Sequence, residues 1–268
     1  MVGGATCTPN CSDAFGDRLL TDHHAFRLLF RALAAGEFSR VASALARRVR
    51  DPFGANDPHR FLQKVPGVIH VGAHGGQERD LYAKFNLRVL WVEAIPHVYE
   101  YLSDQIRSFP RQRAENRLIT DQDGAEYLFH VASNYGMSSS ILPPDRHREL
   151  WPDVSFDTQI SLRSITLDSL LEEIGAGARD YGALVIDTQG SELLVLKGAR
   201  KLLDRIKYVK AEAADFESYS GCAKVVDLER FLSDFGFEPT RRDTIEKKEG
   251  VGGYYDLLFR KPAFKKQQ

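Results

Sequence analysis

The residues most suggestive of chemistry form an apolar run that breaks into a glycine-rich turn. Residues 68–76 read Val-Ile-His-Val-Gly-Ala-His-Gly-Gly, and a second apolar run ends on Glu93, seventeen residues after Gly76. A strand, a glycine turn, a helix and a strand tipped by an acid are typical of a nucleoside site. The glycines let the backbone approach the ligand, and the acid accepts hydrogen bonds from ribose hydroxyls. The pattern predicts a nucleoside cofactor, with an ordinary strand-to-helix turn as the alternative.

The spacing of the glycines indicates which cofactor the turn accepts. A dinucleotide turn has glycine at its first, third and sixth positions, but counting from Gly72 these positions hold His74 and Gln77. An imidazole fits badly where a pyrophosphate must approach, and no Gly-Lys-Ser/Thr of a phosphate loop follows. A cofactor without phosphates, such as S-adenosylmethionine, makes no such demand.

Two further residues are candidates for proton transfer. Asp187 ends a predicted strand and faces the cleft where ligands bind in such sheets, although it also suits a helix cap. His147 lies in a proline-rich stretch and is the best histidine base, or else a surface residue between two arginines. Ser139 lines the cofactor mouth or a solvated loop, and Tyr219 is placed to touch an acceptor.

Composition narrows the class of protein. The 268 residues carry a net charge of −1 with 27% charged residues, so nothing directs the chain to nucleic acid. No apolar run of about 18 residues predicts a membrane span. Three sparse cysteines, Cys7, Cys11 and Cys222, favour a reducing cytoplasm over a disulfide framework.

The elements that must position these residues alternate between strand and helix. Residues 24–50 show helical periodicity, and residues 51–58 are a turn-rich connector, so we expect an N-terminal tail and helical extension over 1–58 and one domain over 59–268. Strands are expected at 66–72, 88–93, 116–120, 182–187 and 206–213, and helices at 77–86, 97–108, 166–174, 190–203 and 223–235. This order predicts an α/β fold with a mostly parallel, Rossmann-like sheet.

Two regions depart from simple alternation. Residues 236–240 and 253–260 are strands without a helix between them, so they should pair as an antiparallel C-terminal hairpin. Methyltransferases that use S-adenosylmethionine have this feature, and most dinucleotide folds lack it. The insertion at about 121–180, which includes a strand near 125–132, is expected to form the wall of the acceptor site.

The motifs together resemble the FkbM family of S-adenosylmethionine-dependent methyltransferases, over roughly residues 66–260. Val-Gly-Ala-His-Gly-Gly76 is similar to the family's Asp-Val-Gly-Ala-Asn-x-Gly, and Trp91-Val-Glu-Ala-Ile-Pro96 to its Phe-Glu-Pro-x-Pro. Residues 164–170 are similar to its Thr-Leu-Asp-x-Leu stretch, and residues 184–199 to Ile-Lys-Ile-Asp-x-Glu-Gly-x-Glu-x-x-Val-Leu-x-Gly-Ala. The resemblance implies a class I methyltransferase sheet and methylation of a hydroxyl of a sugar, a glycan or a secondary metabolite.

Four positions differ from the family pattern. His70 and His74 stand where Asp and Asn are usual, and Val185 and Gln189 where Lys and Glu are usual. These departures keep a non-catalytic S-adenosylmethionine-binding module open, and a nicotinamide-dependent oxidoreductase is the other alternative.

The predicted roles follow from the turn, the strand ends and the insertion. The residues expected to bind the cofactor are His70, Gly72, Ala73, His74, Gly76, Glu93, Ala94, Ile95, Arg117, Asp121, Ser139 and Asp187. Asp187 and His147 are the expected catalytic residues, and His70 is alternatively a core histidine. No metal is expected, because the His70–His74 spacing places ligands on one face only in a helix. The expected partner is a small molecule or glycan with a free hydroxyl, and a homodimer remains open.

Overall fold

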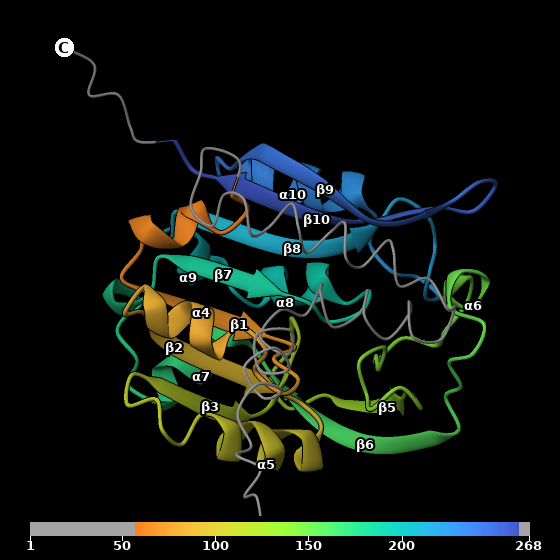
Figure 1. Ribbon diagram of the computed structural model, residues 1–268, viewed down its shortest axis with the longest axis horizontal. Helices are drawn as coiled ribbons and strands as arrows, with labels where there is room; N and C mark the ends of the chain where they lie inside the picture. The colour runs from red at the N-terminus through yellow and green to blue at the C-terminus, as the bar shows by residue number, and fades with distance from the viewer. Residues whose placement is uncertain (1–56, 263–268) are drawn as a thin grey trace, which may run out of the picture.

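The fold is built on a seven-stranded sheet with the strand order β3-β2-β1-β7-β8-β10-β9 (Figure 1). The structure, a computed structural model, describes residues 57–262. The strands are β1 (Gly67–Val71), β2 (Arg88–Glu93), β3 (Gln112–Asn116), β7 (Ala183–Ile186), β8 (Tyr208–Ala214), β9 (Glu238–Lys248) and β10 (Gly252–Arg260). Neighbours pair in parallel, except that β10 runs antiparallel to both β8 and β9. The predicted mostly parallel sheet with an antiparallel C-terminal hairpin is confirmed.

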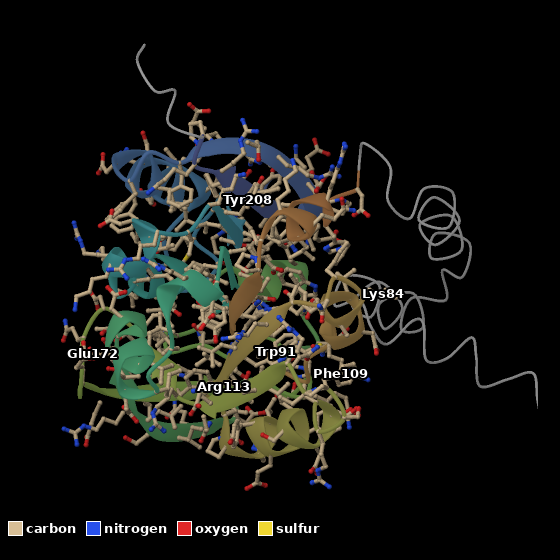
Figure 2. The ribbon with its side chains drawn as sticks, turned by 90° about the vertical axis from the view of Figure 1, so that its left-hand side faces the viewer. Lys84, Trp91, Phe109, Arg113, Glu172 and Tyr208 are labelled. Atoms are coloured by element: carbon tan, nitrogen blue, oxygen red, sulfur yellow. The ribbon has the colours of Figure 1, made fainter. Side chains whose placement is uncertain are left out.

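Helices cover both faces of this sheet. One face packs against the 3-10 helix η1 (Arg60–Lys64), α4 (Arg79–Lys84) and α5 (Pro96–Gln105). The other packs against α7 (Leu167–Glu173), α8 (Glu192–Lys197), α9 (Arg200–Leu203) and α10 (Val225–Asp234). Every residue of β1 and β7 is buried, as expected for central parallel strands covered on both sides. In Figure 2 Trp91 lies inside the molecule, whereas Glu172 lies at its surface.

The insertion forms a second, three-stranded sheet with the order β4-β6-β5. Its strands are β4 (Leu118–Ile119), β5 (Glu126–Val131) and β6 (Thr158–Ile165), and the short helix α6 (His147–Leu150) lies between β5 and β6 in the chain. Figure 1 shows these elements on the side toward which β1 and β7 point. The insertion therefore lies beside the carboxyl ends of the parallel strands, where a nucleoside cofactor is expected.

The third strand of the main sheet differs from its predicted position. It spans Gln112–Asn116 rather than 116–120, and residues 118–119 belong to the second sheet. The strand Gln-Arg-Ala-Glu-Asn lies at the edge of the sheet, and none of its residues is fully buried. An edge strand of this composition has no apolar alternation from which it could be predicted.

The remaining elements agree with prediction apart from their bounds. The helix expected at 190–203 is divided into α8 and α9 around Gly198, where a Cβ atom would lie 2.1 Å from the carbonyl oxygen of Thr120. The strand β6, the helix α6 and the 3-10 helices η1 and η2 (Ala178–Asp180) were not predicted. The expected helices over 24–50, together with Cys7 and Cys11, lie outside the described residues. Among residues 57–262, no helix has both the length and the apolar character needed to cross a membrane.

Candidate active site

The glycine turn joins the ends of three strands. The backbone N–H groups of Gly72 and Ala73 both donate to the carbonyl of Val92, at 3.0 and 3.1 Å. Gly72 has φ +79°, and a Cβ atom there would lie 1.9 Å from the carbonyl oxygen of Asp187. Only glycine permits this backbone conformation together with so close an approach. The ends of β1, β2 and β7 therefore meet at one point, with Glu93 and Asp187 beside it.

Glu93 closes the turn from the second strand. One of its carboxylate oxygens accepts the N–H of His74 and the other accepts the N–H of Ile95, each at 2.8 Å. The pKa of Glu93 is raised to about 7, mainly by burial and also by the negative charge of Asp187, against the lowering effect of the backbone N–H groups. A carboxylate has about four lone-pair sites. The two backbone bonds therefore leave Glu93 with capacity to accept hydroxyl groups.

His74 links the glycine turn to the insertion. Its Nδ1 lies 2.8 Å from Nε2 of Gln77, and its Nε2 lies 2.9 Å from the carbonyl oxygen of Tyr135. Because the amide nitrogen only donates and the carbonyl only accepts, the proton is assigned to Nε2. His74 has φ +46°, a left-handed conformation that is uncommon for residues other than glycine. Its ring fixes the start of the loop 134–140 above the turn.

The loop 187–190 is held from below by Glu192. An oxygen of this buried carboxylate accepts the N–H groups of Thr188 and Gly190, both at 3.0 Å. Burial raises the pKa of Glu192 to about 7. The N–H of Asp187 in turn donates to the carbonyl of Val71 at 3.0 Å, which ties this loop to the end of β1.

A chain of side-chain contacts runs from Asp187 into the insertion. Gln189 donates through Nε2 to Oδ1 of Asp187, and its Oε1 lies 3.2 Å from the hydroxyl of Tyr219. The same hydroxyl lies 2.8 Å from the carbonyl oxygen of Ser138, and the hydroxyl of Ser140 donates to the carbonyl of Gln189 at 2.7 Å. Tyr219 is fully buried, so it contacts these groups rather than the surface at which an acceptor was expected.

His147 is also buried, with 1% of its surface exposed. Its Nε2 lies 3.1 Å from the hydroxyl of Ser138, and its ring packs beside those of Trp151 and Tyr219. The histidine expected as a base therefore lies behind Ser138, whereas Asp187 is half-buried at the strand end.

A cavity of about 400 Å³ opens beside the end of β2. Ala94, Asn116 and Arg117 lie on its wall, together with Leu118, Asp123, Gly124 and residues 162–165. Asn116 donates to the carbonyls of Glu93 and Ala94, at 2.8 and 3.0 Å, and so fixes this rim. The cavity has the volume of a small-molecule site. Asp121, expected at the same site, is not on its wall.

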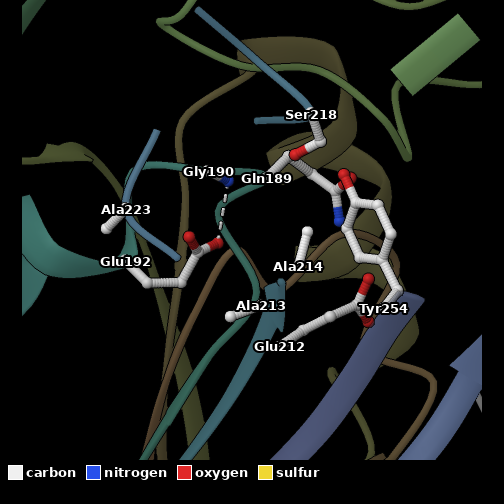
Figure 3. A pocket seen from close by; sticks show the side chains of 9 residues that line it. All are labelled: Gln189, Gly190, Glu192, Glu212, Ala213, Ala214, Ser218, Ala223 and Tyr254. Atoms are coloured by element: carbon white, nitrogen blue, oxygen red, sulfur yellow. Dashed lines mark hydrogen bonds between the residues drawn. The ribbon is translucent and has the colours of Figure 1, made fainter. Parts of the chain in front are cut away.

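A second cavity, behind the loop 187–190, is far smaller. Its volume is about 10 Å³, which is room for about one water molecule. Figure 3 shows Glu192, Glu212 and Tyr254 around it, with Glu192 turned toward the N–H of Gly190. It is too small for a cofactor or an acceptor.

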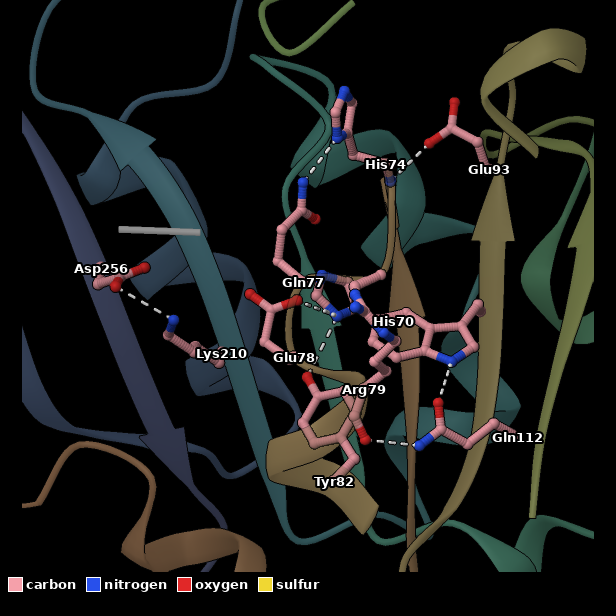
Figure 4. A network of polar contacts seen from close by, with 12 residues as sticks. His70, His74, Gln77, Glu78, Arg79, Tyr82, Glu93, Gln112, Lys210 and Asp256 are labelled. Atoms are coloured by element: carbon pink, nitrogen blue, oxygen red, sulfur yellow. Dashed lines mark hydrogen bonds and ion pairs between the residues drawn. The ribbon is translucent and has the colours of Figure 1, made fainter. Parts of the chain in front are cut away.

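His70 belongs to a polar network below the turn (Figure 4). Its ring is stacked on Trp91 with centroids 5.0 Å apart, and Nδ1 lies 3.1 Å from the hydroxyl of Tyr82. Burial lowers the pKa of His70 to about 3, so its contact with Glu78 at 3.9 Å joins a neutral ring to an acid. His70 is a packed core residue here, which was the alternative to a cofactor contact.

The structure brings together some of the predicted residues and separates others. Gly72, Ala73, His74, Glu93 and Asp187 meet at the carboxyl edge, and Ala94 and Arg117 share the larger cavity. Gly76 shapes the turn from behind, with φ +66° and the Leu102 side chain close to it. Ser139 is buried within the loop 134–140, and Ile95 is buried next to Gly136 of that loop. Sequence reasoning missed Asn116, Tyr135 and Gln189 as parts of the site, although Gln189 was noted as a departure from a pattern.

Among the described residues, no group of three or more His, Cys, Asp or Glu side chains is arranged to hold a metal ion. The polar groups at the carboxyl ends of β1, β2 and β7 are instead carboxylates and backbone N–H groups.

Comparisons with known proteins give the following matches. The profile described as "Methyltransferase FkbM domain" matches residues 70–239. The "2-O-methyltransferase NoeI" of Sinorhizobium fredii is 26% identical over 189 residues, which cover 66% of this chain and 76% of that protein.

Two solved structures are also similar. The magnesium protoporphyrin IX methyltransferase of Synechocystis PCC 6803, with S-adenosylmethionine bound, has 12% identity and a TM-score of 0.43, covering 94% of this chain and 92% of that one. The N-methyltransferase NodS of Bradyrhizobium japonicum has 8% identity and a TM-score of 0.44, covering 76% and 94%.

Proposed function

Because this chain belongs to the family of FkbM methyltransferase domains, it is an S-adenosylmethionine-dependent methyltransferase, and we propose that its acceptor is a hydroxyl oxygen of a sugar, a glycan or a secondary metabolite. The observation that carries the proposal is the pair of acids, Glu93 and Asp187, on either side of the Gly72 turn. The similarity to a 2-O-methyltransferase supports oxygen as the atom that is methylated. A nicotinamide-dependent oxidoreductase, the earlier alternative, finds no support in these matches.

The charge of the site fits the methyl donor. S-adenosylmethionine carries a sulfonium and an ammonium against one carboxylate, so it is a cation overall. Three carboxyls, those of Glu93, Asp187 and Glu192, lie close to one another at this edge, and the charge of Asp187 adds to burial in raising the pKa values of the other two. A bound cation relieves this crowding. A pyrophosphate, by contrast, adds negative charge to the same place.

The residues that would hold the donor follow from their positions. Glu93 has acceptor capacity for the two ribose hydroxyls, and the backbone at Gly72 and Ala73 supports the amino-acid part. The cavity beside Ala94 and Arg117 has room for the adenine. When bound, the donor supplies an activated methyl group on a positively charged sulfur.

The protein's own contribution is to orient the acceptor and to take its proton. An alcohol becomes a better nucleophile as its proton is removed, which calls for a base at the acceptor. Asp187 stands at the strand end and is the base in this proposal, because His147 is buried behind Ser138. Alignment of the acceptor oxygen by the insertion supplies the remainder of the rate enhancement.

A turnover assay tests this function. The full-length protein is incubated with S-adenosylmethionine and a panel of sugars, glycans and hydroxylated metabolites, while S-adenosylhomocysteine release is measured and products are identified by mass spectrometry. We expect transfer to an oxygen, and a strong loss in Asp187→Asn. Binding of S-adenosylhomocysteine without turnover on any acceptor would instead support the non-catalytic binding module. Transfer to a nitrogen or carbon atom would overturn the choice of oxygen.

We also propose that residues 1–58 form an N-terminal extension, that residues 59–268 form the methyltransferase domain, and that residues of about 121–180 form the acceptor wall. A cytoplasmic location and a homodimer complete the proposal.

A further inference from the structure

Gln189 occupies a position that its surroundings hold fixed. It has φ +54°, in the left-handed region that costs roughly 1–2 kcal/mol for a residue other than glycine. Its carbonyl accepts the hydroxyl of Ser140, and Glu192 accepts the N–H groups on both sides of it, at Thr188 and Gly190. Gly190 has φ +101° and packs against Tyr219 and Cys222. The backbone conformation of Gln189 is therefore set by contacts within the protein.

The side-chain amide of Gln189 contacts two groups, the carboxylate of Asp187 and the hydroxyl of Tyr219. Its Nε2 donates to Oδ1 of Asp187, and its Oε1 faces the hydroxyl of Tyr219 at 3.2 Å. An ionised carboxylate only accepts hydrogen bonds, so it requires the NH₂ end of the amide. The hydroxyl of Tyr219 has one proton, shared between the carbonyl oxygen of Ser138 at 2.8 Å and Oε1 of Gln189 at 3.2 Å. The carboxylate of Asp187 therefore sets the orientation of the amide, and Tyr219 packs at its other end.

Tyr219 is anchored to the insertion by further contacts. Its hydroxyl lies 2.8 Å from the carbonyl oxygen of Ser138, and its ring packs against that of His147 with centroids 5.2 Å apart. His147 in turn contacts the hydroxyl of Ser138 at 3.1 Å. Gln189, Tyr219, Ser138 and His147 are all at least nine-tenths buried. The contacts form a buried chain from the insertion to the carboxylate of Asp187.

We propose that Gln189 is a positioning residue, which holds the carboxylate of Asp187 in the orientation in which it accepts the acceptor's proton, and that Tyr219 and Ser138 fix Gln189 in turn. This inference rests on the base role proposed above for Asp187. It assigns the buried His147 to the support of this chain rather than to proton transfer. It also links the insertion, which is the expected acceptor wall, to Asp187 through the side-chain amide of Gln189.

The substitution Gln189→Glu tests the proposal with almost no change in shape. It removes the side-chain N–H that Gln189 donates to Asp187 and places a second carboxylate beside it. Two adjacent carboxylates cannot both ionise easily and share a proton. Asp187 already lies within electrostatic reach of three other carboxyls, those of Glu78, Glu93 and Glu192.

The expected result is a shift of the pH–rate profile. The acid limb of kcat in Gln189→Glu moves to higher pH by about one unit or more, so that kcat at a given pH on that limb falls about tenfold and recovers as the pH rises. In Gln189→Ala, kcat falls about tenfold or more at every pH and the acid limb shifts less than in Gln189→Glu, because the carboxylate loses this donor but gains no acidic neighbour. Tyr219→Phe weakens kcat by a smaller factor than Gln189→Ala. Gln63→Glu, an exposed residue of η1, is the matched control for added charge and keeps the wild-type profile.

Thermal unfolding and calorimetric titration with S-adenosylhomocysteine accompany each rate measurement, so that misfolding and lost cofactor binding are seen separately. A wild-type pH–rate profile in a folded Gln189→Glu variant overturns the positioning role. The proposed function fails in a different way: if folded Asp187→Asn retains full activity, Asp187 is not the base. If Asp187→Asn is inactive but Gln189→Glu is unshifted, the positioning role alone is rejected.

Discussion

His70 on β1 and Val185 on β7 lie directly opposite each other in the parallel register of the two central strands. Lys210 on β8 is the next residue along the same row, opposite Val185. In the family pattern that the sequence resembles, the positions of His70 and Val185 hold Asp and Lys. The two departures from that pattern are therefore cross-strand neighbours. Lys210 forms an ion pair with Asp256 on β10, its Nζ lying 3.1 Å from Oδ2 of Asp256.

This relationship predicts coupling between the two positions. Val185→Lys places a second ammonium beside Lys210 without an acid opposite, so we expect it to lower the free energy of unfolding by about 3–5 kcal/mol. The double variant His70→Asp/Val185→Lys recovers part of that loss, because the two new charges face each other. Urea unfolding of the wild type, both single variants and the double variant measures the coupling energy. Strictly additive effects would show that the two positions are independent.

The contact between His74 and the carbonyl of Tyr135 predicts that the turn restrains the loop 134–140. His74→Asn tolerates the left-handed backbone but is too short to reach Tyr135. We expect faster hydrogen–deuterium exchange across the loop in this variant and a higher KM for the acceptor. Overall stability should change by only about 1 kcal/mol, the net worth of a typical hydrogen bond.

The exposed His97 on α5 offers the matched control, since His97→Asn removes a histidine remote from the loop. The restraint is refuted if exchange in the loop is the same in His74→Asn as in the wild type.

The carboxylate of Glu93 predicts a specific loss of cofactor affinity. Glu93→Gln replaces one of its two accepting oxygens by an NH₂ group, which then faces a backbone N–H and cannot accept a ribose hydroxyl. Losing hydrogen bonds to a charged group costs about 1.5–3 kcal/mol, so Kd for S-adenosylhomocysteine should rise roughly 10- to 100-fold. Isothermal titration calorimetry measures this, with thermal unfolding as the check on folding. Unchanged affinity would remove the ribose role.

The sequence predicted those parts of the fold and site that depend on local pattern. The run ending at Gly72 and the carboxylate of Glu93 were found because an apolar strand, a glycine and an isolated acid are each visible in the sequence. The edge strand Gln112–Asn116 was missed because it has no apolar alternation. The burial of His147 and Tyr219 was missed for a related reason. It depends on how the insertion folds over the sheet, and a polar loop does not encode that in its periodicity.

Three buried carboxyls predict that the folded protein becomes less stable as the pH rises through neutrality. The pKa values of Glu78, Glu93 and Glu192 are each raised from 4.5 to about 7, with burial as the largest cause. Between these two pH values the folded state therefore binds more protons than the unfolded state. Linkage then requires the free energy of unfolding to fall as the pH rises. The stabilising contribution of each group is complete below about pH 4.5 and is lost as the pH rises through about 7.

Glu78 offers the cleanest test, because it takes no part in the proposed cofactor contacts and its Oε2 has no hydrogen-bond partner among the described residues. Glu78→Gln removes one titrating group, so the loss of stability between about pH 5 and about pH 8 should shrink by about 1–3 kcal/mol. Urea unfolding at several pH values measures the slope, and Glu126→Gln, an exposed acid on β5, should leave it unchanged. A slope in Glu78→Gln equal to that of the wild type would mean that Glu78 is already ionised in the folded protein, held so by the nearby charge of Lys210, which lowers its pKa.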